Sequence, residues 1–160
     1  MILIDTINIE PLVKAIKKFE LFRQNLKTEQ EQAGAIQAFE YCFELSWKIM
    51  QRLLGVRGKV ANSPKEAFRM AALEGFIKDP ELWFDFLKKR NLTEYTYEEK
   101  EAQEVISVLS DFSQELQTFL KNIIKDFEES NLPYKVDIVD WNKCSDDFRA
   151  LIKKDLVQIQ

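Results

Sequence analysis

The stretch that decides the fold is residues 36–54, which read IQAFEYCFELSWKIMQRLL. Apolar side chains recur in it every three or four residues, at Ile36, Phe39, Phe43, Trp47, Met50 and Leu54. This is the period of an α-helix with one buried face, so the sequence predicts a long amphipathic helix over about residues 30–54. We expect Phe43 and Trp47 to lie in the core or at the contact between two copies, rather than in a ligand pocket.

Helices are also expected on both sides of this segment. An apolar stripe predicts one over about residues 10–27, and a near-heptad seam predicts a long one over about residues 97–127. Ser63-Pro64-Lys65-Glu66 has the pattern of an N-cap, a first-turn proline and a capping box, and Asp79-Pro80-Glu81 repeats this start signal. The expected fold is therefore all-α, an antiparallel up-and-down bundle of four to five helices.

The character of the sequence changes after residues 131–133. Residues 134–141 read YKVDIVDW, which is β-branched and partly alternating and predicts a strand, with a short helix and a second strand after it. Such strands are only marginally stable alone, so we expect the tail to pair with this chain or with another. The predicted organisation is a helical domain over residues 1–129 and a short β-α(-β) extension over residues 130–160.

Composition limits the chemistry that is available to the chain. Its 160 residues include no histidine, which excludes His-dependent triads, His-ligated zinc and histidine general-base catalysis. The net charge of −4 argues against a protein that binds nucleic acid through its overall field. Cys42 and Cys144 are too few and too far apart for a disulfide framework, and Cys42 is expected in the core. No signal peptide or membrane span is predicted, so we expect a cytoplasmic protein. We expect no cofactor.

One stretch combines residues that bind phosphates and bases. Residues 88–97 read KKRNLTEYTY and place a cationic cluster beside Asn91 and two tyrosines, at a junction between helices. Arg90 can hold a phosphate through two parallel hydrogen bonds, and the rings of Tyr95 and Tyr97 can stack on a base. The alternative is structural, with the cations compensating a helix C-terminal dipole and the tyrosines packing at the turn. Residue types and spacing alone favour the structural interpretation, because helix C-termini often carry such cations.

Four blocks together resemble a known family. Residues 39–48, the start signal at 63–66 followed by Arg69, Trp83, and residues 90–97 are similar, in this order and spacing, to the nucleotidyltransferase substrate-binding protein family, a branch of the HEPN superfamily. The resemblance extends from about residue 10 to residue 127. It implies a helical bundle that dimerises and acts with a separate minimal nucleotidyltransferase, as its substrate-binding subunit or as one half of a toxin–antitoxin pair.

Five residues are predicted to bind the nucleotide or the partner. These predicted residues are Lys48, Arg90, Asn91, Tyr95 and Tyr97. In the toxin-like branch an Arg-x4-His-x-Tyr motif carries ribonuclease activity, and the partner inactivates it by nucleotidylating the tyrosine. Arg90 matches the arginine and Tyr97 the modified tyrosine, but Tyr95 stands at the histidine position. Because tyrosine, with a pKa of about 10, is a poor acid or base at neutral pH, we expect a non-catalytic subunit. A ribonuclease with a degenerate Arg-x4-Tyr-x-Tyr motif and a plain scaffold are the alternatives.

The tail carries a second resemblance. Residues 132–140 and 148–152 look like the end of a minimal nucleotidyltransferase, in which the carboxylate at the position of Asp137 is the third metal-binding acid. The Gly-Ser loop and the Asp-x-Asp pair of that enzyme are absent from the sequence, so no metal site is expected in this chain alone. The tail is then either a fusion remnant or a strand that pairs with a partner's sheet.

Overall fold

The structure is a computed structural model that describes residues 1–4 and 6–129. In this part of the chain the elements follow in this order: β1 (Leu3–Ile4), β2 (Ile7–Asn8), α1 (Glu10–Phe22), α2 (Glu29–Val56), α3 (Pro64–Leu73), α4 (Pro80–Leu92), the 3-10 turn η1 (Thr93–Tyr95), α5 (Glu99–Ile106) and α6 (Leu109–Glu129). The predicted all-α bundle is confirmed. The extension predicted over residues 130–160 lies outside the described residues.

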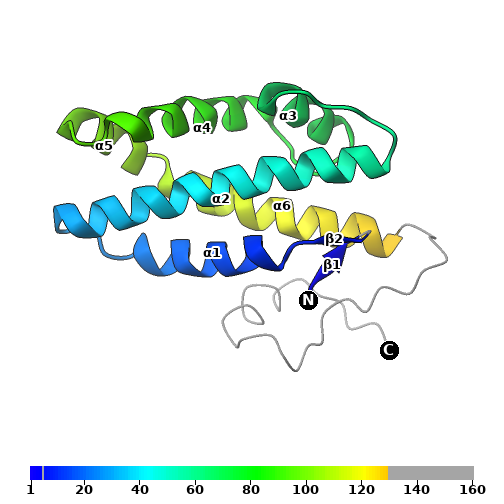
Figure 1. Ribbon diagram of the computed structural model, residues 1–160, viewed down its shortest axis with the longest axis horizontal. Coiled ribbons are helices and arrows are strands. Elements are labelled where there is room, and N and C mark those ends of the chain that lie inside the picture. Colours follow the sequence, from blue (N-terminus) through cyan, green and yellow to red (C-terminus); the bar gives the residue numbers. More distant parts are fainter. Residues whose placement is uncertain (5, 130–160) are drawn as a thin grey trace.

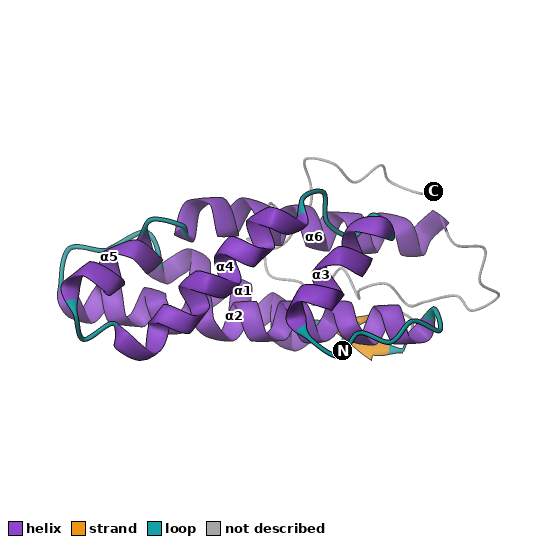
Figure 2. Ribbon diagram, turned by 90° about the horizontal axis from the view of Figure 1, so that it is seen from above, coloured by secondary structure: helices purple, strands orange, loops and turns teal. Residues whose placement is uncertain are grey.

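The helices form two layers (Figure 1). Figure 1 shows α1, α2 and α6 lying lengthwise, while α3, α4 and α5 follow one another along the opposite side of α2. Figure 2 looks onto this second row and shows that α5 and the β1–β2 hairpin lie toward opposite ends of the bundle. Helix α2 packs against α1, α3, α4 and α5. The helix that contains the decisive sequence stretch is thus the central element of the fold.

Side-chain caps fix the beginnings of the central helices. At α2, the Thr28 hydroxyl accepts a hydrogen bond from the Glu31 backbone N–H at 3.1 Å, and the Glu31 carboxylate accepts one from the Thr28 N–H at 2.8 Å. At α3, the predicted Ser63 cap accepts from the Glu66 N–H at 3.3 Å. The Glu66 carboxylate, however, accepts from the N–H of Asn62 at 2.7 Å. The complete reciprocal box is therefore at α2, and at α3 its carboxylate half is shifted by one residue.

An aromatic core centred on Trp83 joins the two rows of helices. Trp83 of α4 is fully buried, and five phenylalanine rings have their centroids 5.4–6.5 Å from its ring: Phe43, Phe68, Phe86, Phe112 and Phe119. Cys42 and Phe43 are buried as predicted. Trp47 is half-buried and packs against the core from its edge, so it lies only partly in the core, and its predicted alternative place at a contact between two copies stays a prediction.

The helix predicted over residues 97–127 is two helices. Its apolar seam is buried as expected, at Ala102, Val105, Leu109, Phe112, Leu116, Phe119, Ile123 and Phe127. Between α5 and α6, however, the Ser107 hydroxyl donates to the Glu104 carbonyl at 2.6 Å, and the Val108 N–H donates to the Val105 carbonyl at 3.2 Å. These short-range bonds replace the α-helical pattern for one turn. The first helix is also shorter than predicted, because α1 ends at Phe22.

A short antiparallel hairpin precedes the helices and was not predicted. Ile4 pairs with Ile7, and Thr6 in the turn has a φ of 72°. Ile4 and Ile7 are buried, so the hairpin adds to the hydrophobic core at the base of α1.

Candidate functional site

The residues of the candidate site are positioned by the end of α4. Arg90 lies in the last turn of this helix, where the Thr93 hydroxyl donates to the Arg90 carbonyl at 2.7 Å. The Thr96 hydroxyl donates in turn to the Thr93 carbonyl at 3.1 Å. Threonine side chains that bond to the preceding backbone compete with helix continuation. They convert the chain here into η1 and the turn that carries Tyr97.

The guanidinium of Arg90 faces two carboxylates of α2. Its Nε donates to Glu44 Oε1 at 2.9 Å, and its Nη2 lies 3.6 Å from Glu40 Oε1. The second oxygen of Glu44 accepts a hydrogen bond from the Trp47 indole Nε1 at 2.9 Å. Lys89, the neighbouring cation, pairs instead with Glu104 of α5 at 3.4 Å. Arg90 thus ties α4 to α2, while Lys89 ties it to α5.

The two tyrosines of the motif are at the surface. Tyr97 is 80% exposed and Tyr95 is 51% exposed, whereas the Arg90 side chain is 24% exposed. Asn91 is exposed on the last turn of α4. Neither tyrosine ring is therefore buried, and the part of the structural interpretation in which the tyrosines pack at the turn stays a prediction. The cationic part of that interpretation agrees with the position of Lys89 and Arg90 in the last turn of α4.

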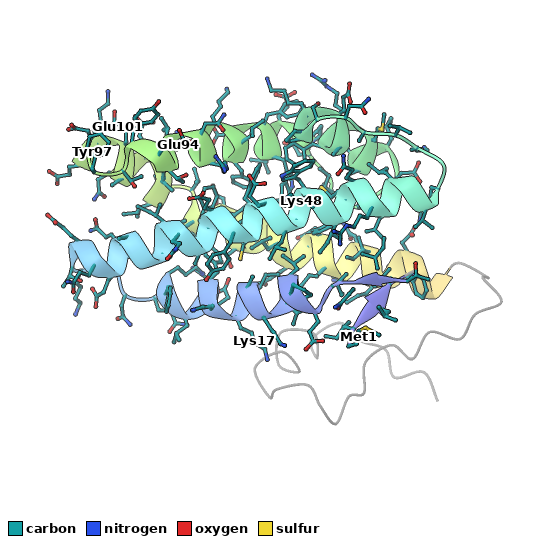
Figure 3. The ribbon with its side chains drawn as sticks, in the orientation of Figure 1. Met1, Lys17, Lys48, Glu94, Tyr97 and Glu101 are labelled. Atoms are coloured by element: carbon teal, nitrogen blue, oxygen red, sulfur yellow. The ribbon has the colours of Figure 1, made fainter. Side chains whose placement is uncertain are left out.

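Lys48 is separated from the tyrosines. Figure 3 shows Tyr97, with Glu94 and Glu101 nearby, at the end of the bundle formed by η1 and α5, and Lys48 farther along α2. Lys48 is exposed and follows Glu44 by one helical turn. The structure therefore places Lys48 next to the carboxylate side of the site and away from its aromatic side.

Glu40 and Glu44 are the residues of this site that the sequence analysis missed. Both belong to the block over residues 39–48 that carries the family resemblance, where Phe39-Glu40 and Phe43-Glu44 repeat at a spacing of four. That repeat puts both carboxylates on one face of α2. This repeat was the sequence signal that could have indicated the two glutamates. Their partner could not be found in the same way, because Arg90 lies 46 residues from Glu44.

Two other titratable groups of α2 have raised pKa values. Burial raises the pKa of the Cys42 thiol, with a further contribution from the charge of Glu20, so this thiol stays protonated at neutral pH. Burial also raises the pKa of Tyr41, whose hydroxyl oxygen is the one buried side-chain oxygen or nitrogen without a hydrogen-bond partner among the described residues. Neither group is prepared to act as a nucleophile.

The described part of the chain holds no group of three or more cysteine, aspartate or glutamate residues that could bind a metal ion. Asp137, the predicted remnant of a third carboxylate, lies outside the described residues. Within residues 1–4 and 6–129, no helix combines the length and the apolar character that crossing a bilayer requires.

Comparison with known proteins defines the class. The family described as nucleotidyltransferase substrate binding protein like matches residues 7–125, and the chain belongs to this family. The predicted resemblance over residues 10–127 is thereby confirmed.

Two solved structures share the fold. A protein from Thermus thermophilus has 30% sequence identity and a TM-score of 0.65, with 70% of this chain and 98% of that chain covered. A Haemophilus influenzae protein, described as revealing the fold of a substrate binding domain of a nucleotidyltransferase, has 28% identity and a TM-score of 0.65. That comparison covers 73% of this chain and 99% of that chain.

Two curated proteins of Haemophilus influenzae are similar to parts of the chain. The probable ribonuclease HepT is 36% identical over 85 residues, which is 50% of this chain and 58% of that protein. The probable protein adenylyltransferase MntA is 53% identical over 34 residues, or 21% of this chain and 30% of that protein. The chain therefore spans less than two thirds of each curated relative, and it combines similarity to a probable ribonuclease with similarity to a probable protein adenylyltransferase.

Proposed function

We propose that this chain is a non-catalytic, homodimeric, cytoplasmic subunit that docks a separate minimal nucleotidyltransferase and helps to bind the nucleotide or its acceptor. The family match supports the association with a nucleotidyltransferase. The observation that carries the binding role is the Arg90 guanidinium, which is held by Glu44 yet 24% exposed, on a turn with two exposed tyrosines. An arginine fixed in this way binds anionic oxygens well, because its remaining N–H groups are already oriented.

The non-catalytic role rests on residue chemistry. Cleavage of RNA by general acid–base catalysis needs a group that exchanges a proton near neutral pH. The chain has no histidine, and Tyr95 occupies the place of the motif histidine. Tyr97 has a different role in this proposal. Its 80% exposure makes its hydroxyl accessible to a partner enzyme, as an acceptor of a nucleotidyl group.

A toxin-type ribonuclease is the second candidate function. The observation that favours it is the similarity to a protein named probable ribonuclease HepT. In this alternative Arg90, Asn91, Tyr95 and Tyr97 form a degenerate cleavage site, and the chain is one half of a toxin–antitoxin pair. The site geometry described above is common to both candidates, so activity measurements must separate them.

Binding of ATP to the full purified chain tests the first candidate. We expect ATP to bind, and we expect Arg90→Ala to weaken binding about tenfold or more, the value of one charge-assisted hydrogen bond. Size-exclusion chromatography with light scattering is expected to give a dimer. Absence of ATP binding in the wild-type chain, or unchanged binding in Arg90→Ala, would contradict the proposed nucleotide site.

Two further measurements separate subunit from ribonuclease. Incubation with the Haemophilus influenzae adenylyltransferase and ATP is expected to add adenylyl mass to the wild-type chain but not to Tyr97→Phe. Tyr95→Phe is the matched control and should still be modified. Purified wild-type chain is expected to leave RNA intact. Cleavage that disappears in Arg90→Ala would overturn the non-catalytic proposal in favour of the ribonuclease.

A further inference from the structure

The two carboxylates that face Arg90 are bound in different ways. The contact between Arg90 Nε and Glu44 Oε1, at 2.9 Å, is a charge-assisted hydrogen bond of ordinary length. The contact between Arg90 Nη2 and Glu40 Oε1, at 3.6 Å, is an ion pair that is too long for a hydrogen bond. Both carboxylates belong to α2 and lie one turn apart, so they approach the same guanidinium from one helix.

Glu44 is fixed in place on both of its oxygens. Oε1 accepts from Arg90, and Oε2 accepts from the indole N–H of Trp47 at 2.9 Å. Trp47 itself is half-buried and packs against the core. The Glu44 carboxylate is therefore anchored to the bundle, and it fixes the guanidinium of Arg90 from the Nε side.

Glu40 is held much more loosely. Its side chain is 40% exposed, and within the described residues its contact with Arg90 Nη2 is its one ion pair. A half-exposed pair of this length contributes little free energy, and a glutamate side chain has several rotamers available in water. Glu40 can move away from Arg90 without breaking a hydrogen bond in the bundle.

The Glu40 carboxylate competes with an incoming anionic ligand for the guanidinium of Arg90. A guanidinium binds an oxyanion through pairs of parallel N–H groups, and Nε is already used by Glu44. An incoming phosphate must therefore use the Nη nitrogens, and the Glu40 carboxylate lies beside Nη2. The two anions would repel each other if both remained there.

We propose that Glu40 is an internal anion that occupies the Nη side of Arg90 in the free protein and is displaced by a phosphate group of the nucleotide. Glu44 holds Arg90 in both states. This inference rests on the proposed function, because it takes Arg90 as the nucleotide-phosphate site. Glu40 then lowers the affinity of the site for every phosphate ligand.

The test compares ATP affinities of full-length variants by isothermal titration calorimetry at constant ionic strength. Glu40→Gln removes the competing charge and keeps the side-chain size, so we expect ATP to bind about two- to fivefold more tightly, the range set by a weak exposed ion pair. Glu40→Asp keeps the charge but shortens the side chain by one methylene group, and it should give an intermediate affinity.

Glu29→Gln is the matched control. It removes the same charge from the exposed first turn of α2, 11 residues or about 16 Å along the helix, which is more than the Debye length of about 8 Å in physiological salt. We expect its ATP affinity to equal that of the wild-type chain. An equal gain in Glu29→Gln and Glu40→Gln would mean that net charge alone acts, and it would overturn the proposal.

The outcomes also separate this inference from the proposed function. If the wild-type chain binds ATP and Arg90→Ala does not, but Glu40→Gln binds with wild-type affinity, then the competing role of Glu40 is wrong and the nucleotide site stands. If neither the wild-type chain nor Glu40→Gln binds ATP, both proposals fail.

Discussion

Replacing Trp83 by alanine should cost more stability than any other single truncation in the aromatic core. Trp83 is fully buried in α4, and its ring contacts phenylalanines of α2, α3 and α6. Its indole N–H also donates to Glu115 Oε2 at 3.3 Å. The side chain is therefore the point at which four helices meet.

The expected magnitude follows from burial. Truncation of a buried tryptophan to alanine costs about 3–5 kcal/mol in free energy of unfolding, because the cavity that remains closes only in part. The total free energy of unfolding of a domain is roughly 5–15 kcal/mol, so Trp83→Ala should remove a large share of the stability. Trp83→Phe keeps an aromatic ring but leaves Glu115 without its donor, and we expect it to cost about 1–2 kcal/mol.

Trp47→Ala is the internal comparison. Trp47 is half-buried, so the lost burial and its hydrogen bond to Glu44 together amount to roughly 1–2 kcal/mol. Urea unfolding followed by far-UV circular dichroism measures all three variants, since the helical signal does not depend on the tryptophans. A cost for Trp47→Ala that equals or exceeds that of Trp83→Ala would refute the placement of the core. So would a cost below about 1 kcal/mol for Trp83→Ala.

Two further predictions concern the end of α3 and the glycines. Hydrogen bonds and ion pairs with Lys59 and Arg57 lower the pKa of Glu74 from its ordinary value of 4.5, so its stabilising contribution is present above pH 4.5 and is lost as the pH falls through the lowered pKa. Glu74→Gln should therefore lower the melting temperature at pH 7, and the difference from wild type should disappear at low pH; a constant difference would contradict it. Gly34→Ala should stabilise α2 by about 0.5–1 kcal/mol, because the new Cβ would lie at an ordinary contact distance of 3.5 Å from Phe22. Gly75→Ala should instead lower the free energy of unfolding by about 1 kcal/mol, because φ is +80° at this position. Melting curves of both variants test this, and shifts of the same sign would contradict it.

The helices could be predicted because their signals are local. The caps at Ser63 and Asp79 and the apolar periods lie within a few residues of the structure that they specify. The break at Ser107 could not be predicted from periodicity, because the apolar seam keeps its spacing across it. The hydroxyl bond that ends α5 becomes visible only in the folded backbone.

The half-buried position of Trp47 has a geometric cause. Steps of four residues from Phe39 to Phe43 and on to Trp47 each overshoot a full turn by about 40°, so Trp47 has drifted about 80° from Phe39 around the helix. The buried face continues instead through Ser46, whose hydroxyl donates to the Cys42 carbonyl at 2.7 Å. A serine whose hydroxyl is bonded within its own helix can lie in the core, although its residue type does not predict this.

The candidate site was predictable only on the α4 side. Residue types and spacing indicate Arg90 and the two tyrosines, because these lie within eight consecutive residues. The carboxylates that face Arg90 come from α2, and no local pattern connects them to it. Lys48 was predicted together with the tyrosines, although α2 carries it along the bundle away from Tyr97.

The repeated Phe-Glu pairs of α2 join the fold to the site. Neighbouring residues of a helix are about 100° apart, so a buried phenylalanine directs the following glutamate to the edge of the buried face. Phe39 and Phe43 are fully buried, and the next residues, Glu40 and Glu44, both reach Arg90. The same rotation of α2 that packs the rings against the core therefore sets the position of both carboxylates. Because one carboxylate is anchored by Trp47 and the other is loosely held, the core fixes where Arg90 lies while leaving its outer nitrogens open to exchange of anions.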